Sequence, residues 1–570
     1  MPKNKKTERR FTPALSMKHF AEKIAKHNEK DVFMWTDAAG ADRKMTYAEF
    51  SNMVKKQAAA FGSMDWKQKR IAILGETSPY WIATYIAAIA SGNVAIPMDK
   101  ELEISEIEGF LSFAEADAVV FSSAFNAKLE NAVNNHDTVS LFIALGIDGC
   151  SYADNEKVIS YDVLLERGDK AIDEGYVMPE PEDMQRMAVM LFTSGTTGTS
   201  KCVMLSEKNV VFAMNAACGC VEFFPEDTIV SCLPVHHTYE LCCLLAGMNY
   251  GMNIGINDSL RRVVRNFEKY KPTGLVLVPL FITTMNKKIW DNVKKQNKTK
   301  LINGAIKVTS GLRKIGIDLR PLVFKQIIAA FGGRLNRIVS GGAPLNPQLV
   351  KDFDSFGIQI SEGYGITECS PLISVNPYFA PKPGSVGPAV EGCEVKIDAE
   401  TVNDLGFEQG EILARGGNVM LGYYKNPEAT AAVFTEDGYF RTGDIGYLDE
   451  DGYIFITGRK KSVIVLENGK NVFPEEIEEY LSRLDCVGES VVVGRTKEGS
   501  DTVTLTAIVY PAPDMFANET DVNKIAEKVK ADINAMNRTL VGYKQIRAVE
   551  IRRTEFEKTT SKKIKRHLVK

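Results

Sequence analysis

The sequence predicts an α/β protein with a small additional domain, and three observations lead to this fold class. Apolar runs with the length of buried strands alternate with helical segments up to about Ser370. Short strands separated by glycines begin at Gly384, which is typical of an antiparallel, barrel-like piece. About a hundred residues follow Gly458, the size of a small α+β domain. We therefore expect a large N-terminal domain of two α/β subdomains plus a distorted antiparallel barrel, followed by a small α+β C-terminal domain.

The first α/β subdomain begins with helical stretches and continues in strand–helix–strand order. Residues 11–66 read as helical stretches, and Thr46-Tyr47-Ala48-Glu49 has the form of a capping box at the start of a helix. The loop-forming segment between residues 193 and 201 is flanked by two apolar runs, at 187–192 and 202–205. The other expected elements are strands at 70–75, 94–97, 118–121 and 141–145, with a helix at 79–90.

The second α/β subdomain is expected from about Asp227 to Ser370. Strands alternating with helices imply parallel sheets, and ligands of such sheets bind at the carboxyl ends of the strands. The domain boundary is placed at Arg459–Ser462, which gives an N-terminal domain of residues 1–458 and a C-terminal domain of residues 459–570. The expected strands are 228–233, 274–278 and 337–340 in this subdomain, then 387–390, 394–397 and 410–415 in the barrel-like piece.

Composition and charge exclude several classes of protein. The chain has 570 residues, 45% hydrophobic and 25% charged, as in globular proteins of two or more domains. A net charge of −4 argues against nucleic acid as a partner. We find no signal peptide, and polar residues and glycines interrupt the most apolar windows, so no transmembrane segment is expected. Ten cysteines without paired C-x-x-C motifs indicate reduced thiols in a cytoplasmic enzyme, without structural zinc.

The densest candidate site is the segment Thr193–Lys201, which reads TSGTTGTSK. Glycines let backbone N–H groups approach an anion, hydroxyls donate to its oxygens, and a lysine neutralises it. The segment is not a Walker A loop, because that pattern starting at Gly195 needs a glycine where Ser200 stands. A polar surface loop between two strands is the alternative, but few ordinary turns carry so many hydroxyls.

This segment resembles the phosphate loop of the adenylate-forming (AMP-binding) superfamily, which contains acyl-CoA synthetases, firefly luciferases and peptide-synthetase adenylation domains. The resemblance is closest to AMP-forming long-chain fatty acid–CoA ligases. It implies activation of a carboxylic acid, expected to be a fatty acid, by ATP to acyl-AMP with release of pyrophosphate, followed by transfer to CoA. ATP, Mg²⁺ and CoA are therefore expected to bind. Six further segments match the superfamily in order, at residues 231–237, 340–345, 362–368, 438–444, 458–461 and 558–564.

The resemblance also assigns roles to single residues. It implies that Lys461 is a hinge about which a mobile C-terminal domain rotates, and that Gly469 contacts CoA. The implied metal-binding residues are Glu368 and Thr196, and the implied catalytic residues are Lys563, His237, Thr196 and Lys201. The implied nucleotide-binding residues are Thr193, Ser194, Gly195, Thr196, Thr197, Gly198, Lys201, Gly342, Ala343, Gly363, Tyr364, Gly365, Thr367, Asp444 and Arg459.

The chemistry gives a reason for several of these residue types, and each has a simpler alternative. A glutamate such as Glu368 suits Mg²⁺, which prefers oxygen ligands, but it could be a solvated charge. Asp444 can accept hydrogen bonds from two ribose hydroxyls or can stabilise a turn. Arg459 is expected at the ribose or phosphate, with a surface ion pair as its alternative. His237 is expected to gate the acyl site, with a core histidine as its alternative.

The residues after His237 bear on the substrate. Thr238 stands where relatives that activate amino acids carry an aspartate, which argues against an amino-acid substrate. Glu240 follows as in fatty-acid-activating relatives, or it could favour a helix N-terminus with Thr238 as the N-cap. Lys562 stands where the family has glycine, so Lys562 and Lys563 compete for the catalytic position. Ile564 favours Lys563, and a basic terminal tail is the alternative.

Two other functions stay open at this stage. The acyl group could be loaded onto the phosphopantetheine of an acyl carrier protein, because its thiol is chemically the same as that of CoA. A nucleotide-binding regulator without turnover is the alternative from another class, and the presence of Lys201, Glu368, Asp444 and Lys563 argues against it. The sequence leaves room for peripheral membrane contact. Acyl chain length, oligomeric state and pathway are not readable from the sequence.

Overall fold

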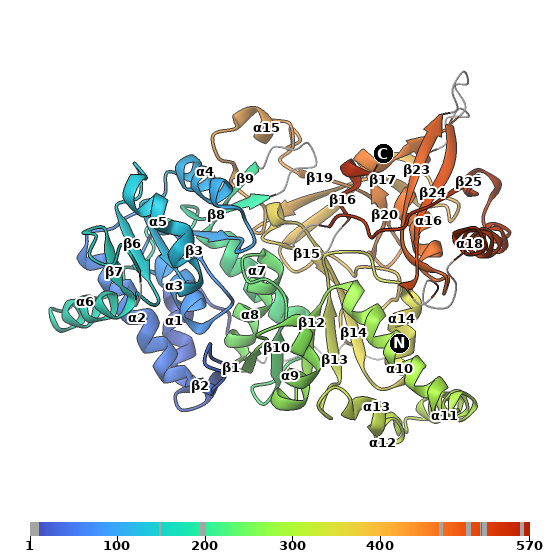
Figure 1. Cartoon of the computed structure of the whole chain (residues 1–570), viewed down its shortest axis with the longest axis horizontal. Helices are drawn as coiled ribbons and strands as arrows, with labels where there is room; N and C mark the ends of the chain where they lie inside the picture. Colours follow the sequence, from blue (N-terminus) through green and yellow to red (C-terminus); the bar gives the residue numbers. More distant parts are fainter. Residues whose placement is uncertain are drawn as a thin grey trace. The chain divides into compact units, whose positions relative to one another are not determined.

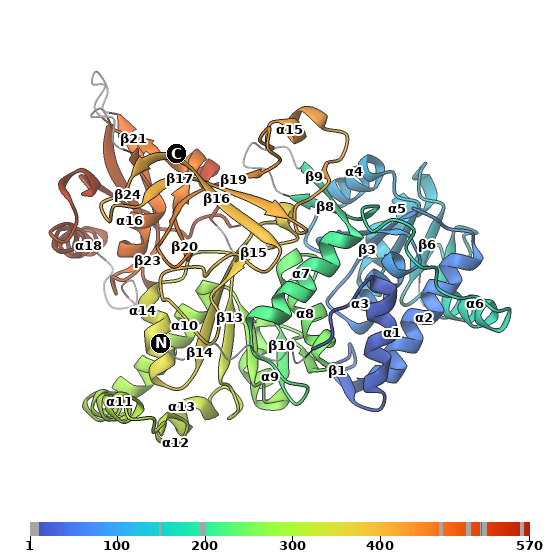
Figure 2. The ribbon, with the colours of Figure 1, turned by 180° about the vertical axis from the view of Figure 1, so that it is seen from behind.

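The computed structural model describes residues 11–147, 150–193, 201–466, 471–496, 503–513, 515, 521–558 and 564–569. The chain forms two compact units, each described here by itself. Unit 1 contains residues 1–394 and 414–440, and unit 2 contains residues 395–413 and 441–570. The ribbon of both units is drawn from opposite sides in Figures 1 and 2. The domain boundary at Arg459–Ser462 stays a prediction.

The first sheet of unit 1 has eight strands in the order β18-β9-β8-β4-β3-β5-β6-β7. The run from β8 to β7 is parallel, and β9 and β18 add antiparallel strands at one edge. The strands expected in this region are confirmed. Their bounds are β3 Arg70–Leu74, β4 Val94–Met98, β5 Ala118–Phe121, β6 Leu141–Ala144, β7 Val158–Ser160, β8 Met187–Thr193, β9 Lys201–Ser206 and β18 Gly422–Tyr423.

Helices in this region begin where the sequence signals place them. The expected capping box is present, because Thr46 and Glu49 hydrogen-bond each other's backbone at the start of α2. Helix α3 covers Pro79–Ala90, as expected, and its Ser78 side chain caps the first turn. The helices are α1 Met17–Ile24, α2 Tyr47–Ser63, α3 Pro79–Ala90, α4 Ile104–Ala114, α5 Asn126–Asn135, α6 Tyr161–Asp173 and α15 Pro427–Ala431.

The second sheet of unit 1 also has eight strands, in the order β15-β14-β13-β12-β10-β11-β1-β2. Strands β14 to β1 are parallel, as expected, and β15 and β2 are antiparallel edge strands. The sequence did not predict β1 and β2, which lie within residues 11–66. The bounds are β1 Asp31–Thr36, β2 Asp42–Thr46, β10 Thr228–Ser231, β11 Asn253–Ile256, β12 Gly274–Leu277, β13 Arg337–Ser340, β14 Gln359–Gly365 and β15 Leu372–Val375.

Two helices lie between these sheets. Helix α7 (Glu207–Cys220) contacts β8 and β9 of the first sheet and β15 of the second, and α8 (Thr238–Tyr250) contacts α7, β10 and β11. Figures 1 and 2 both show α7 and α8 in this central position. The helices on the outer side of the second sheet are α9 Val263–Tyr270, α10 Pro279–Lys295, α11 Thr299–Arg313, α12 Arg320–Val323, α13 Lys325–Ala329 and α14 Pro347–Ser355.

The barrel-like piece is an open sheet in the structure. Its four strands have the order β16-β17-β19-β20 and do not close into a barrel. The strands expected at 394–397 and 410–415 lie within β16 and β17. The strand expected at 387–390 is wrong, because Ala389 forms only an isolated bridge with Ser374. The bounds are β16 Cys393–Val402, β17 Glu408–Gly416, β19 Phe440–Leu448 and β20 Ile454–Arg459.

The end of the chain has the expected α+β character. A three-stranded sheet, β23-β24-β25, packs with α16 and α18 around an apolar core that includes Ile477, Val509 and Ile533. All ten cysteines lie within the described ranges and are unpaired thiols, as expected. Among the described helices, none is long and apolar enough to cross a membrane. The bounds are β21 Ile464–Val465, β22 Asn471–Val472, α16 Pro474–Leu481, β23 Val487–Thr496, β24 Val503–Pro511, α18 Val522–Asn537 and β25 Ala548–Ile551.

Candidate active site

The two ends of the predicted phosphate loop lie side by side. Strands β8 and β9 are antiparallel, and Thr193 pairs with Lys201 across them. The Thr193 hydroxyl donates to the Lys201 carbonyl at 3.3 Å. The predicted residues Ser194, Gly195, Thr196, Thr197 and Gly198 lie outside the described residues, so their roles stay predictions. A loop closed by two buried strands has a fixed entrance and exit, which suits a site that must hold phosphate oxygens.

Tyr423 connects two of the predicted site residues. Its hydroxyl donates to Glu368 Oε1 at 2.9 Å, and Lys201 Nζ lies 4.4 Å from the centroid of its ring. The position of Tyr423 is set by β18, which pairs with β9 so that Tyr423 lies opposite Val203. The backbone N–H of Met420 donates to the Glu368 carbonyl at 2.9 Å, which fixes the glutamate from the same segment. Burial, and after it the carboxylate of Glu368, raise the pKa of Tyr423, so the phenol stays a donor.

The segments predicted to contact adenine lie at the carboxyl ends of two neighbouring parallel strands. Gly342 follows β13 with a φ of +84°, a conformation that favours glycine. Gly363, Tyr364 and Gly365 end β14. A Cβ at Gly365 would lie 1.8 Å from the Pro371 carbonyl oxygen, so the backbone can turn here only without a side chain. Ala343 is exposed and Thr367 half-buried just beyond these strands.

An apolar cavity begins at these predicted residues. Gly342, Gly363, Tyr364 and Gly365 line it together with Val276 and Val339 of the sheet. The empty space between these walls, counted together with the part that is open to solvent, is about 840 Å³. One face of α8 forms the opposite wall, through Tyr239, Cys242, Cys243, Ala246, Gly247 and Tyr250. The cavity therefore extends from the carboxyl ends of the strands along the sheet towards their amino ends.

Tyrosines at the two ends of α8 are held by hydrogen bonds to backbone carbonyls. The Tyr239 hydroxyl donates to the Val339 carbonyl at 3.1 Å. The Tyr250 hydroxyl donates to the carbonyls of Cys218 and, at 2.9 Å, Val221. Because these bonds hold both phenol groups in place, the rings form rigid walls at both ends of the cavity face.

The histidine pair lies at the start of α8. His237 is the N-cap residue, its ring centroid lies 4.2 Å from that of His236, and His236 Nε2 lies 3.5 Å from Asp99 Oδ2. The gating role of His237 stays a prediction. The N-cap role considered for Thr238 is wrong, because Thr238 is the first residue inside the helix.

Glu240 lies in the first turn of α8, as the helix N-terminus alternative requires, and its side chain is part of the buried interior. Its side chain is almost fully buried (1% exposed), and the Ser231 hydroxyl donates to its Oε1. Burial raises the pKa of Glu240 to about 8, against the opposing hydrogen bonds from Ser231 and the Leu233 backbone. Glu240 is therefore mainly a neutral carboxylic acid near pH 7.

In unit 2, Asp444 and Arg459 lie opposite each other on the antiparallel strands β19 and β20. Arg459 Nε lies 2.8 Å from Asp444 Oδ1, and the Asp444 side chain is 5% exposed while that of Arg459 is 50% exposed. The Thr442 hydroxyl accepts a hydrogen bond from the Asp444 N–H at 3.1 Å. A nearly buried carboxylate with one fixed cation and a defined backbone can accept the two hydroxyls of a ribose.

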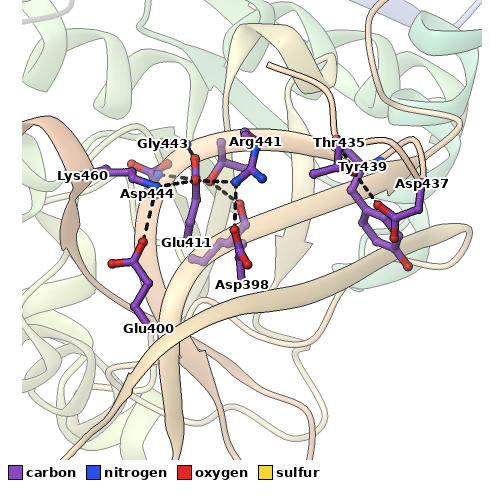
Figure 3. Close-up of polar contacts among 12 residues, drawn as sticks. Asp398, Glu400, Glu411, Thr435, Asp437, Tyr439, Arg441, Gly443, Asp444 and Lys460 are labelled. Carbon is purple, nitrogen blue, oxygen red and sulfur yellow. Dashed lines mark hydrogen bonds and ion pairs between the residues drawn. The ribbon is translucent and has the colours of Figure 1, made fainter. Parts of the chain in front are cut away.

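The turn before Asp444 is held by a residue that sequence reasoning missed, Glu411 of β17 (Figure 3). Glu411 Oε1 accepts the Gly443 N–H at 3.1 Å. Glu411 Oε2 lies 3.0 Å from Lys460 Nζ and 3.1 Å from Arg441 Nη1. The Glu411 side chain is 4% exposed, so its charge is stabilised by these two cations and the backbone rather than by water.

The other predicted residues of unit 2 are described only in part. Lys461 is an exposed residue in the short 3-10 helix that follows β20. Gly469, Lys562 and Lys563 lie outside the described residues. The flanks of the catalytic-lysine motif are described: Lys558 and Ile564 pair through an isolated bridge, and Ile564 packs against an apolar cluster with Val491, Ile508 and Phe556.

Three features of the site could not be found from motifs. Tyr423 comes from a two-residue strand without a motif of its own. Glu411 follows a glycine in a strand whose polar residues look solvated. The cavity face of α8 could have been suspected, because its residues recur at helical spacing (239, 242, 243, 246, 250) and include small side chains.

Comparison with known proteins assigns the chain to a family. The family described as AMP-binding enzyme matches residues 20–424, and the AMP-binding enzyme C-terminal domain matches residues 461–570. A long-chain-fatty-acid–CoA ligase of Mycobacterium bovis is 27% identical over 94% of this chain and 91% of its own length. The peroxisomal long chain acyl-CoA synthetase 6 of Arabidopsis thaliana is 29% identical over 77% of this chain, and the match spans 64% of that relative.

Solved structures agree on the fold. The anthranilate CoA ligase AuaEII in complex with anthranoyl-AMP superimposes with a TM-score of 0.76 at 19% identity, over 98% of this chain and 97% of the other. ATP-bound MatB from Rhodopseudomonas palustris gives 0.72 at 24% identity, over 97% of this chain and 98% of the other. The two family matches cover most of the chain. The protein belongs to the AMP-binding enzyme family.

Proposed function

We propose that the protein is an AMP-forming acyl-CoA synthetase that activates a fatty acid. ATP and the acid form acyl-AMP and pyrophosphate, and the acyl group then passes to the thiol of CoA. The apolar cavity carries this proposal, because it begins at the predicted adenine-contacting residues Gly342 and Gly363–Gly365 and extends away from them. If the carboxylate of a fatty acid lies at the nucleotide end of the cavity, its hydrocarbon tail would extend through the cavity along α8.

The length of the cavity face gives an estimate of the acyl chain. Tyr239 and Tyr250 are eleven residues apart on one helix, which corresponds to about 16 Å at 1.5 Å per residue. Carbon–carbon bonds of about 1.5 Å at an angle of about 111° advance roughly 1.25 Å per carbon. The cavity face therefore corresponds to an extended tail of about 13 carbons. This estimate supports a medium-to-long fatty acid and not a small acid.

The charged residues have complementary tasks in this reaction. The acid and ATP are both anionic, so Lys201 at the end of the phosphate loop would neutralise phosphate oxygens. Asp444 would hold the ribose through its hydroxyls, with Arg459 beside it. Lys563 would stabilise the negative charge that develops when the carboxylate attacks the α-phosphate. The C-terminal domain would then rotate about Lys461 and admit the CoA thiol past Gly469.

Magnesium is part of the proposal, and Glu368 would hold it. The described residues contain no group of three or more His, Cys, Asp or Glu side chains suited to a metal. This fits Mg²⁺, which commonly binds through one or two carboxylates and completes its shell with substrate phosphates and water. One oxygen of Glu368 accepts from Tyr423, which orients the carboxylate and leaves lone pairs for a cation. When bound, the ion would neutralise phosphate charge.

Pyrophosphate release tests the proposal. Acids from acetate to palmitate, and free amino acids, are supplied with ATP and Mg²⁺, with CoA, with a phosphopantetheinylated carrier protein, or with neither. We expect pyrophosphate with fatty acids and acyl-CoA when CoA is added. Acyl transfer to the carrier protein, but not to CoA, would show that the acceptor is the phosphopantetheine thiol of a carrier protein. ATP binding without any pyrophosphate would favour the non-catalytic regulator. A cytoplasmic location and peripheral membrane contact stay predictions.

A further inference from the structure

Residues 279–325, which form α10 to the start of α13, differ in charge from the rest of the chain. They contain eleven Lys and Arg against two Asp, a net charge of +9 in a chain of net charge −4. Arg313 and Arg320 form ion pairs with Asp354, and Arg320 also with Asp318. Eight of the nine lysines make no ion pair within the described part of the chain: Lys288, Lys294, Lys295, Lys298, Lys300, Lys307, Lys314 and Lys325. The segment therefore presents uncompensated positive charge.

The same segment exposes large apolar side chains. Nineteen large hydrophobic residues are exposed among the described residues, and seven of them fall between residues 280 and 323. The most exposed are Leu301 (66%), Val308 (62%), Ile315 (71%) and Leu322 (74%). Such a concentration on a protein surface usually marks a contact with another surface.

The two kinds of side chain form parallel stripes along α11. Leu301, Val308 and Ile315 are seven residues apart, which places them on one side of a helix and of the turn that continues it. A lysine precedes each of them: Lys300, Lys307 and Lys314. A different side of α11 faces the core, where Ile302, Ala305 and Ile306 pack on the apolar cluster of the second sheet. The exposed apolar stripe is therefore not needed to hold the helix in place.

Asp354 of α14 links the end of α11 to α12. Its Oδ2 lies 2.6 Å from Arg313 Nη1 and its Oδ1 lies 3.0 Å from Arg320 Nη1. Ile317 and Leu322 are therefore held close to the end of the α11 stripe. Figures 1 and 2 show α11 and α12 next to each other at the outer edge of unit 1. We call Leu301, Val308, Ile315, Ile317 and Leu322 with Lys300, Lys307 and Lys314 the basic apolar surface.

We propose that the basic apolar surface docks the protein on an anionic lipid bilayer. Lysines attract anionic head groups, and apolar side chains beside them enter the boundary between head groups and acyl chains. The combination of positive charge and apolar side chains favours an anionic bilayer over other partners. A second copy of the same basic surface would be repelled, and a polyanion such as nucleic acid would leave the apolar stripe uncovered. This docking goes beyond the proposed reaction and would place the enzyme where free fatty acids partition.

Co-sedimentation with vesicles tests the charge of the surface. The full chain is mixed, without ATP or acid, with vesicles of phosphatidylcholine alone or of phosphatidylcholine with phosphatidylglycerol. We expect binding to the anionic vesicles only, weakened by added salt. Replacing Lys300, Lys307 and Lys314 by Glu should weaken binding on the order of 100-fold or more, at roughly 1 kcal/mol per lysine. The matched control replaces exposed lysines outside the segment, Lys55, Lys67 and Lys208, by Glu and should keep binding.

Two further variants test the apolar stripe. Replacing Leu301, Val308 and Ile315 by Ser should also reduce binding, and circular dichroism checks that the chain stays folded. Leu301→Trp gives a signal that does not depend on lost binding: brominated lipids should quench its fluorescence. They should not quench that of Val177→Trp, at a site outside the segment that is 74% exposed against 66% for Leu301. The proposal would be overturned if the surface-lysine variant and the control-lysine variant bound anionic vesicles equally well. It would also be overturned if the full chain bound neutral and anionic vesicles equally well, or if the Ser variant changed self-association without changing vesicle binding. Because neither ATP nor acid is present, a failure of the proposed reaction leaves this result unaffected.

Discussion

The hydroxyl of Tyr423 donates to the carboxylate of Glu368 at 2.9 Å, across 55 residues of sequence. The same ring lies 4.4 Å from the Lys201 ammonium, so one tyrosine contacts both the predicted phosphate-neutralising lysine and the predicted metal-binding glutamate. A ring in this position can orient the carboxylate and fix the lysine before any substrate binds. Pre-organised charges and hydrogen bonds of this kind usually make the largest single contribution to transition-state stabilisation.

The first prediction separates the hydroxyl of Tyr423 from its ring. Tyr423→Phe keeps the contact with Lys201 and removes the hydrogen bond to Glu368. Because a hydrogen bond to a charged group contributes about 1.5–3 kcal/mol, we expect the Mg²⁺ concentration for half-maximal acyl-AMP formation to rise at least about 10-fold. Glu368→Gln should abolish adenylation while the protein stays folded.

Tyr424→Phe is the matched control for this measurement. The Tyr424 hydroxyl also donates to a glutamate, Glu115, at 2.7 Å, but this pair is exposed and involves no predicted site residue. We expect its Mg²⁺ dependence to equal that of the wild type. If Tyr424→Phe and Tyr423→Phe behave alike, or if Glu368→Gln keeps its activity at limiting Mg²⁺, Glu368 is not the metal-binding residue.

The second prediction concerns Glu411 as a positioning residue for Asp444. Glu411→Gln leaves Arg441 and Lys460 without their buried counter-charge and weakens the acceptor for the Gly443 N–H. Because both cations are partly exposed and keep Asp398 and Glu400 as partners, the melting temperature should fall only modestly. Because Asp444 would lose its fixed position, the KM for ATP should rise more than kcat falls. Glu400→Gln, an exposed partner of Lys460, is the control and should change neither.

Motifs predicted the strand ends of this fold well because buried strands are short apolar runs bounded by turn residues. Residues 118–121, 337–340 and the helix 79–90 agree with the structure at both ends. Strands β1 and β2 were not predicted, although they form a local antiparallel hairpin, and β1 also pairs with β11, more than two hundred residues later in the chain. The sequence of β1, DVFMWT, does not alternate between apolar and polar residues, because this strand lies between two others in the sheet, and its distant parallel partner adds no sequence signal nearby.

The residues of the candidate site also divide into those that the sequence could predict and those that it could not. Lys201, Glu368 and Asp444 could be selected because each lies in a motif of unusual composition. Tyr423 and Glu411 could not, because a single tyrosine or glutamate gains its role only from a tertiary contact. The sequence offered Glu240 either as a family residue or as a residue that favours a helix N-terminus, and its burial could not be predicted because it depends on the packing of α8 against β10.

The third prediction concerns the acyl chain. Ala246 lines the cavity seven residues after Tyr239, or about 10 Å along α8, which corresponds to about eight carbons. Ala246→Leu should therefore lower kcat/KM for acids of twelve or more carbons, at least roughly 10-fold, and leave acids of up to about eight carbons unaffected. Pyrophosphate release over a series of saturated acids measures this change. A uniform loss across all chain lengths would mean that Ala246 does not limit the tail.

The fourth prediction is a pH dependence of stability caused by Glu240. Burial raises its pKa from 4.5 to about 8, so between these values the unfolded chain loses a proton that the folded chain keeps. The native state therefore binds more protons, and the contribution of Glu240 to stability falls as pH rises from about 4.5 to 8.

Glu240→Gln removes this titration. We expect the free energy of unfolding of the variant, relative to the wild type, to increase by up to about 1.4 kcal/mol per pH unit between about pH 4.5 and 8, and to be level outside that range. Urea unfolding at several pH values measures the difference, so any constant cost of the amide in the buried site cancels. A difference that does not change with pH would show that Glu240 is ionised in the folded protein throughout.

The fifth prediction separates the two half-reactions and the two lysines. Lys558 and Ile564, the residues on either side of the predicted catalytic lysines, pair with each other in unit 2. An ammonium at Lys563 would act only while charge accumulates on the α-phosphate, and removing such a group commonly costs on the order of 10²–10³ in rate. Lys563→Ala should therefore cripple acyl-AMP synthesis yet leave conversion of supplied acyl-AMP to acyl-CoA nearly intact.

Lys461→Pro should have the opposite effect, because a fixed φ stiffens the predicted hinge and hinders the rotation that thiolation needs. Lys562→Ala is the control for register, since it removes the neighbouring charge without touching Lys563. Stopped-flow measurement of pyrophosphate release, and of acyl-CoA formation from synthetic acyl-AMP, gives the two rates separately for each variant. If Lys562→Ala abolishes adenylation and Lys563→Ala does not, the catalytic lysine is Lys562, and the match to the family motif is displaced by one residue.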